Sequence, residues 1–355
     1  MGYVPDKLVN YMEKNRNGKL TINDIATLAG VSKATVSFYL NGRTDKMSDK
    51  TAAKIQEIID RTGYRPNALA RSLNDKRTNM IGVIIGDITN SFANQIVKGI
   101  DDYAQEKGYQ LILASSSYSA DKERRLTESM NEMGADGFIV QPTVQYDAVW
   151  QTMNISKPLV YFDSPTASNG TPWVKTNNYE AVYNAAETMT ARGYERFVMI
   201  TADPYVLRTR MERNKGFADC LELAGKPHEI IIADTHTSAE ELEEKLQAYV
   251  TGDKPACIFV CNNWLLDKTY LALRPYRHLI PERLGLVGFD SLEWSELAIP
   301  SITTIVQPAY EEGRAAARIL IDRIEERNEV EPNQILSCRI NYQESTNRSS
   351  REEQQ

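Results

Sequence analysis

The sequence is poor in the residues that carry most metal and disulfide chemistry. Its 355 residues include four Cys and three His, and His228, His236 and His278 lack the spacing typical of metal ligands. Four Cys in a chain this long do not form a disulfide framework. Cys257 and Cys261 lie in an apolar, strand-like context that favours buried thiols over a metal site. The sequence therefore predicts neither a metal nor a cofactor.

Motifs typical of phosphate binding or of serine activation are also missing. We find no Gly-rich phosphate loop and no G-x-S-x-G elbow. No apolar run approaches the ~18 residues needed to cross a bilayer, and residues 1–19 have no apolar signal core. An enzyme on an α/β fold is one interpretation, but it leaves residues 21–73 unexplained. These absences favour a cytoplasmic protein that is not an enzyme and has no membrane partner.

Charge is distributed unevenly along the chain. The formal net charge is −7, yet residues 1–79 hold 14 Lys and Arg against 8 Asp and Glu. The N-terminal part is therefore net +6 and the remainder net −13. A basic head on an acidic body is typical of a nucleic-acid-binding module joined to a module with another task. The same Lys and Arg side chains could also simply solvate a surface.

Residues 21–41 predict two short helices around a tight turn. Thr21 and Asp24 can form a capping box, Gly30 supplies the backbone freedom of the turn, and Ser32 can cap the second helix. The outward side chains of the second helix are Lys33, Ala34, Thr35, Ser37, Phe38 and Asn41. These side chains suit a helix in a DNA major groove, although two capped helices alone also fit a hairpin from a protein core.

The stretch that follows completes a helical head. The sequence predicts a third helix capped by Ser48 and stopped by Gly63. Residues 67–73 then predict a helix of about two turns, too short to be stable alone in water. We therefore expect an N-terminal extension at 1–19, a helix-turn-helix domain at 20–64, and a hinge helix with its linker at 65–79.

From residue 80 onward, short apolar strands alternate with amphipathic helices. Such alternation predicts parallel doubly wound sheets, and the length predicts two similar subdomains within a core at residues 80–344. We expect the chain to cross between them near residues 162, 290 and 325. The polar tail, residues 345–355, is predicted to be disordered.

Two stretches carry a resemblance to a known family. TINDIATLAGVSKATVSFYLN and RTGYRPNALARSL resemble the DNA-binding head and hinge of the LacI/GalR family of bacterial repressors, and the core resembles that family's sugar-sensing core, which shares its fold with periplasmic binding proteins. The resemblance implies a homodimer on operator DNA, with paired hinge helices and a Leu wedge in the minor groove. The residues implied to contact DNA are Thr21, Ser32, Lys33, Ala34, Thr35, Ser37, Phe38, Asn41, Asn67, Ala70, Arg71 and Leu73. Base readout would fall mainly to Lys33 and Ala34.

Polar residues follow the predicted core strands, where ligands of open α/β sheets bind. The predicted effector-binding residues are Asp87, Ser91, Phe92, Asn94, Asp163, Arg213, Asn262, Trp264 and Asp290. In the resembled family, the positions matching Asp163, Arg213, Asn262 and Asp290 bind sugars. Phe92 or Trp264 could stack on the apolar face of a sugar ring.

The sequence departs from the family pattern after the strand that ends at residue 262. The family usually has Asn-Asp there, whereas this chain has Asn262, Asn263 and Trp264. Arg208 and Arg210 could favour an anionic ligand such as a sugar acid, or could be solvated. We therefore predict a repressor controlled by a small carbohydrate or sugar-acid effector. The alternatives are a sugar-binding protein without a regulatory role, or a catabolite-type regulator that needs a protein corepressor.

Overall fold

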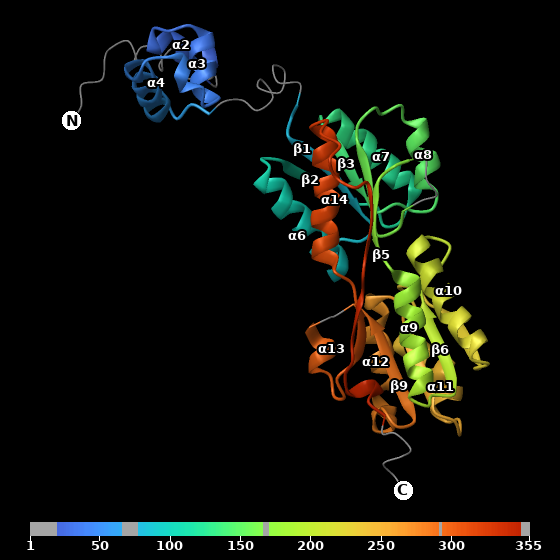
Figure 1. Ribbon diagram of the computed structural model, residues 1–355. Coiled ribbons are helices and arrows are strands. Elements are labelled where there is room, and N and C mark those ends of the chain that lie inside the picture. Colours follow the sequence, from blue (N-terminus) through green and yellow to red (C-terminus); the bar gives the residue numbers. More distant parts are fainter. Residues whose placement is uncertain (1–19, 66–76, 166–169, 291–292, 349–355) are drawn as a thin grey trace. The chain divides into compact units, whose positions relative to one another are not determined.

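A computed structural model describes residues 20–65, 77–165, 170–290 and 293–348 (Figure 1). Its contacts divide the chain into two units that meet between Thr78 and Asn79. The predicted extension at 1–19 and the predicted hinge helix lie outside the described residues. Within the described ranges, no helix is both long and apolar enough to span a bilayer.

The first unit is a helical head. Its elements are α2 (Ile22–Ala29), α3 (Lys33–Leu40), a 3-10 turn η1 (Thr44–Lys46) and α4 (Asp49–Thr62). The capping box at the start of α2 is confirmed, because the Asp24 carboxylate accepts from the Thr21 backbone N–H at 2.7 Å. Gly30 has the left-handed φ of 64° that the turn requires. Ser32 caps α3 by accepting from the Thr35 backbone N–H at 3.1 Å.

The three helices of the head enclose a small core. Ile25, Val36 and Ile55 come one from each helix and are fully buried at its centre. Because Val36 faces inward, Lys33 and Ala34 in the first turn of α3 are exposed. The core therefore fixes which side of α3 a ligand could reach.

The second unit contains two sheets of six strands each. The first sheet has the order β11-β5-β4-β3-β1-β2, and all its pairings are parallel. Its strands are β1 (Met80–Ile85), β2 (Gln110–Ser115), β3 (Gly137–Val140), β4 (Leu159–Phe162), β5 (Trp173–Thr176) and β11 (Asn333–Leu336). We call this sheet and its helices the first subdomain. Its helices are α6 (Ser91–Glu106), α7 (Ala120–Glu132), α8 (Tyr146–Thr152) and α14 (Ala309–Ile324).

The second sheet has the order β12-β10-β9-β8-β6-β7, and its only antiparallel pairing among the described strands is β10 with β12. Its strands are β6 (Arg196–Thr201), β7 (His228–Ile232), β8 (Ala256–Val260), β9 (Leu284–Phe289), β10 (Thr303–Val306) and β12 (Arg339–Asn341). The second subdomain also contains α9 (Asn178–Ala191), α10 (Arg208–Leu223), α11 (Ala239–Val250), α12 (Asn263–Leu273), α13 (Glu293–Leu297) and the 3-10 turns η2 (Arg274–Leu279) and η3 (Glu344–Thr346).

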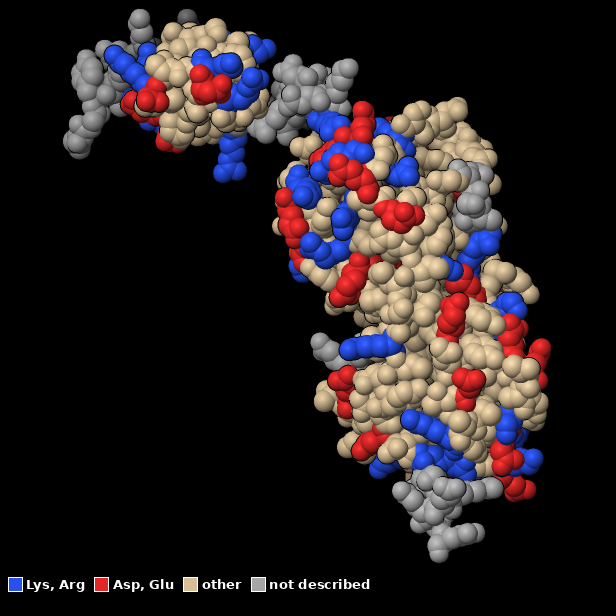
Figure 2. All heavy atoms as spheres, viewed as in Figure 1, with Lys and Arg blue, Asp and Glu red and all other residues tan. Residues whose placement is uncertain are grey.

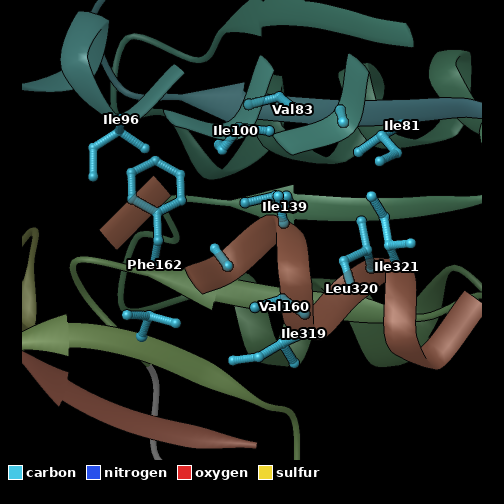
Figure 3. Close-up of a cluster of buried hydrophobic side chains, with 14 of the residues drawn as sticks. Ile81, Val83, Ile96, Ile100, Ile139, Val160, Phe162, Ile319, Leu320 and Ile321 are labelled. Carbon is cyan, nitrogen blue, oxygen red and sulfur yellow. The ribbon is translucent and has the colours of Figure 1, made fainter. Parts of the chain in front are cut away.

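Helices cover both faces of each sheet, as the alternating pattern predicted. In the first subdomain, Val83, Ile139 and Val160 pack against α6 and α14 (Figure 3). The alternate strand residues Phe138 and Tyr161 point to the opposite face and pack with α7 and α8. Burial on both faces explains why these strands read as continuous apolar runs.

The predicted crossover positions are wrong. The chain passes between the two sheets near residues 177, 307 and 337, not near 162, 290 and 325. In each case the chain adds one more strand, β5, β10 or β11, before it leaves a sheet. Strand β5 was not predicted from the sequence because it has only four residues, and only alternate ones are fully buried. It therefore lacks the apolar run that marks its neighbours.

The predicted polar tail begins inside the fold. Ser345 is fully buried; it donates to the Leu286 carbonyl at 2.6 Å and accepts from the Thr303 N–H at 2.8 Å. Thr346 is also fully buried and bonds the Thr303 hydroxyl at 2.6 Å. Small hydroxyl side chains satisfy buried backbone groups at low volume cost, so a polar stretch need not be exposed. The prediction of disorder is wrong for these residues, and residues 349–355 lie outside the described part.

Candidate functional site

One candidate site is the exposed surface of α3. Lys33 and Ala34, in its first turn, are exposed, whereas Thr35 is half-buried and its hydroxyl lies 2.9 Å from the Ser32 hydroxyl. The predicted Phe38 is half-buried, with the guanidinium carbon of Arg43 5.5 Å from its ring centre. These positions leave the helix N-terminus and one basic side chain open to a nucleic acid.

The remaining predicted DNA contacts lie away from the exposed first turn of α3. Thr21 is exposed but uses its hydroxyl in the capping box, Ser37 is half-buried, and Asn41 is exposed at the C-terminal end of α3. Lys and Arg side chains are visible over the described head (Figure 2). The predicted hinge contacts Asn67, Ala70, Arg71 and Leu73 lie outside the described residues.

A second candidate site is the junction between the two subdomains of the core. Direct hydrogen bonds join the subdomains there. Asn263 at the start of α12 donates to the Asn90 side chain at 2.7 Å and to the Ser91 hydroxyl at 3.2 Å. At another point of the junction, the Arg208 backbone N–H donates to the Ser164 hydroxyl at 2.7 Å. The junction therefore brings the carboxyl ends of strands from both sheets against each other.

Arg213 of α10 is a fixed cation in this junction. It is buried, its Nε donates to the Asn178 side chain at 2.7 Å, and its Nη1 donates to the Cys261 carbonyl at 2.7 Å. Its guanidinium carbon lies 3.6 Å from the ring centre of Phe289. Two hydrogen bonds and an aromatic face hold the guanidinium in one orientation, which pre-organises it for a ligand.

Three buried or half-buried carboxyl groups lie close enough to Arg213 for its charge to influence their pKa values. Burial raises the pKa of Asp163, and the nearby Arg213 opposes that rise. Burial likewise raises the pKa of Asp290 to about 6, again with Arg213 opposing. Glu312 is fully buried, and burial followed by the charge of Asp163 raises its pKa well above the ordinary range. The group can therefore hold protons as well as negative charge at neutral pH.

Hydrogen bonds connect these carboxyl groups to the crossovers. The Asp163 backbone N–H donates to Glu312 at 2.7 Å. Gln307 donates to the Asp290 carboxylate at 3.0 Å and accepts from the Thr176 hydroxyl at 2.7 Å. Residues 176 and 307 lie on two different crossovers. Any ligand that moves Asp290 thus acts directly on the segments that join the subdomains.

The third crossover is tied to the first. The Asn177 backbone N–H donates to the Leu336 carbonyl at 3.1 Å, and its side chain accepts from the Cys338 N–H at 2.7 Å. The three crossovers are therefore linked by hydrogen bonds rather than independent.

The structure brings together only part of the predicted effector set. Asp163, Arg213 and Asp290 are close enough to influence one another's charge. The Asn262 side chain accepts from the Ala202 N–H at 2.8 Å, so one of its polar atoms serves the fold. Ser91 meets Asn263 as described.

Four other predicted effector residues lie in a loop, at the surface or against an apolar core rather than in the group around Arg213. Asp87 accepts from the Thr89 N–H at 2.9 Å within its own loop, and Asn94 is exposed. Phe92 lies in the apolar core of the first subdomain, because the first turn of α6 packs against the sheet. Trp264 is half-buried and packs against the core of the second subdomain. The stacking role that the sequence suggested for both rings remains a prediction, and these contacts weaken it.

Sequence reasoning missed several junction residues. Gln141 is buried and donates to the Asp163 carboxylate at 2.7 Å while it accepts from the Gly86 N–H at 2.8 Å. It directly follows β3, so the rule that ligands bind at the carboxyl ends of strands could have found it. Gln307 directly follows β10, so the same rule could have found it. Glu312 gave no such signal, since it belongs to the first turn of α14.

Comparison with known proteins agrees with this two-part organisation. Residues 21–67 match the model of the bacterial regulatory proteins of the lacI family, and residues 186–346 match that of a periplasmic binding protein-like domain. The structure is similar to the lac repressor dimer bound to operator and the anti-inducer ONPF, with a TM-score of 0.80, 22% identity, and coverage of 93% of this chain and 99% of that one. At this identity the likeness establishes the fold.

Sequence relatives extend the match to nearly the full chain. The probable HTH-type transcriptional regulator EndR of Paenibacillus polymyxa is 30% identical over 336 residues, which is 92% of this chain and 98% of the relative. Catabolite control protein A of Priestia megaterium is 31% identical over 332 residues, 92% of this chain and 99% of the relative. The chain therefore belongs to the LacI family of helix-turn-helix DNA-binding transcriptional regulators, which are not enzymes.

Proposed function

We propose that this protein is a repressor whose operator binding is controlled by a small carbohydrate or sugar-acid effector at the subdomain junction. The observation that carries the proposal is the group formed by Arg213, Asp163 and Asp290, in which the charge of a buried guanidinium influences carboxyl groups from both subdomains. Carboxylate acceptors and guanidinium donors on opposite walls can bind adjacent hydroxyl groups of one ring.

The helical head supports the DNA-binding part of the proposal. A recognition helix as short as α3 reads only a few base pairs, so a homodimer on a near-palindromic operator would double the specificity. Lys33 can donate to guanine O6 and N7, whereas Ala34 offers only a methyl contact. The resemblance further assigns to Leu73 the role of a minor-groove wedge, and that assignment stays a prediction.

The coupling between the two sites follows from the crossovers. A ligand that contacts both subdomains prefers one relative orientation of them, and it shifts the population toward that orientation by its difference in affinity. Asp290 bonds Gln307, which bonds Thr176 on a second crossover. Effector binding at Asp290 would thus bias the segments that set the subdomain orientation.

The test uses Arg213→Ala and Asp290→Ala. Both variants should bind operator like the unaltered protein and no longer respond to the effector, because each loses a partly desolvated ligand group. Operator binding would be measured by fluorescence anisotropy, with and without a sugar or sugar acid found by thermal-shift screening. Arg124→Ala is the control, since Arg124 lies half-exposed on α7. If both junction variants respond at the original effector concentration, the effector binds elsewhere.

A further inference from the structure

The first turn of α10 carries two guanidinium groups in addition to Arg213. Arg210 is only 6% exposed. Its Nη1 donates to the Asp203 carbonyl at 3.0 Å, and its guanidinium carbon lies 5.1 Å from the ring centre of Tyr118. Tyr118 belongs to the first subdomain, between β2 and α7, so Arg210 reaches across the junction.

Arg210 and Arg208 have no ion-pair partner among the described residues, and the charges of Asp163 and Asp203 only partly oppose the effect of burial on the pKa of Arg210. The Nε of each is buried and has no hydrogen-bond partner among the described residues. Burial also lowers the pKa of Arg210, which reflects the cost of a charge taken out of water. A buried guanidinium without an anion is costly, so a stable site of this kind calls for one.

The nearby carboxyl groups do not supply the missing charge in full. The Asp163 carboxylate already accepts from Gln141 through Oδ2, and its Oδ1 is buried and unpaired among the described residues. Burial raises the pKa of Asp163 and of Glu312, which favours their neutral forms. The junction thus offers unpaired donors on α10 and an unpaired oxygen on the facing strand end.

That combination matches one class of small molecule. An Arg fork recognises a planar carboxylate through parallel N–H donors. The free oxygen of Asp163 suits a hydroxyl donor. Neutral sugars would leave the two Nε groups without an anion.

We propose that the effector is a polyhydroxylated carboxylate, a sugar acid, whose carboxylate binds Arg208 and Arg210 and whose hydroxyl groups donate to Asp163. This inference rests on the proposed effector site at the junction and narrows its ligand to one chemical class. Arg210 is the specificity-determining residue in this assignment, since it is the more deeply buried of the two cations. Arg213 keeps its place against Phe289 in either case.

The experiment compares acids with their neutral parents on the full chain. Thermal-shift and titration-calorimetry measurements would use D-gluconate, D-galactonate, D-glucuronate and D-galacturonate against D-glucose, D-galactose, D-glucitol and glucose 6-phosphate. We expect at least one acid to raise Tm and to bind at least tenfold more tightly than its neutral parent. A neutral sugar that binds as well as its acid, a preference for the phosphate, or no binding by any acid would overturn the proposal.

Variants then locate the carboxylate. Arg210→Gln should weaken binding of the selected acid at least tenfold and leave the neutral parent unchanged, and Arg210→Lys should recover part of the loss because it restores the charge without the fork. Arg124→Gln, at an exposed position of α7, should bind as the unaltered protein does. If Arg210→Gln fails to fold, the half-buried Arg208→Gln takes its place. Unchanged acid binding in the folded variant would refute the assignment.

The outcomes also separate this inference from the function on which it rests. If neutral sugars bind and the acids do not, the carboxylate assignment fails while a carbohydrate-controlled regulator stands. If Arg213→Ala still responds to the bound acid in the operator assay, the junction itself is not the effector site.

Discussion

Asn263 and Asn90 belong to different subdomains, yet their side chains share a hydrogen bond of 2.7 Å. The family usually has Asp at the position of Asn263. An Asp there could accept but not donate at neutral pH, whereas the Asn amide donates to Asn90 and to Ser91. The departure from the family pattern therefore puts an amide donor at the subdomain junction in place of a second carboxylate.

Removal of the hydrogen bonds from Asn263 to Asn90 and Ser91 should make the subdomain junction easier to open. Asn263→Ala loses both hydrogen bonds to the first subdomain, each worth about 1 kcal/mol, while the cores of the two subdomains are untouched. We expect faster amide hydrogen exchange at the N-terminal turn of α6 and an effector affinity reduced several-fold. Gln95→Ala is the control because Gln95 is exposed near the start of α6 and is not a predicted effector residue. Equal exchange in Asn263→Ala and the unaltered protein would mean that these hydrogen bonds contribute nothing to closure.

Glu312 should make the protein less stable as the pH rises. Its pKa is raised in the folded state, so it contributes stability at low pH that is lost as pH rises through the folded pKa. Glu312→Gln keeps an oxygen for the Asp163 N–H and removes the titration. The variant should therefore be more stable than the unaltered protein at pH 9, and the gain should shrink toward pH 5.

Urea unfolding at pH 5, 7 and 9 measures this difference. Glu311→Gln, the exposed neighbour on α14, is the matched control and should show no such trend. A gain for Glu312→Gln that is independent of pH would show that Glu312 does not titrate in this range.

The fold could be predicted from the sequence where local signals and burial agree. Thr21, Gly30 and Ser32 act through neighbouring backbone groups, so their roles as caps and turn are readable from adjacent residues. Strands buried on both faces could be predicted because their sequences are continuous apolar runs. Strand β5 did not, because its place depends on pairing with β11, whose residues come about 160 positions later.

From the residues alone, members of the candidate site could be predicted only where they directly follow a strand. Asp163 and Asp290 satisfy that rule, and both have the left-handed φ of a chain that turns away from its sheet. Glu312 reaches the site from the first turn of a helix that follows a crossover. Its role depends on the crossovers being side by side, a tertiary arrangement that no local pattern encodes.

Operator affinity should fall steeply with salt. Each phosphate contact neutralised by Lys or Arg releases counterions, so the logarithm of affinity falls in proportion to the number of contacts. With six or more contacts in a dimer, affinity should drop by a factor of about 10³ between 50 and 200 mM salt. Fluorescence anisotropy over this range, together with the mass of the complex by light scattering, measures both quantities. Salt-insensitive binding or a monomer on DNA would count against the proposed mode.

Lys33 should discriminate between operator and non-specific DNA. It is exposed in the first turn of α3, above the buried Val36 that orients the helix, so its ammonium group can reach a guanine edge. Lys33→Ala should cost about 1–3 kcal/mol on the preferred operator and little on unrelated duplex, where only phosphate contacts remain. Lys54→Ala, an exposed change on α4, should leave the ratio of the two affinities unaltered. Anisotropy titrations of each variant with both duplexes give that ratio, and an equal loss on both would reduce Lys33 to a phosphate contact.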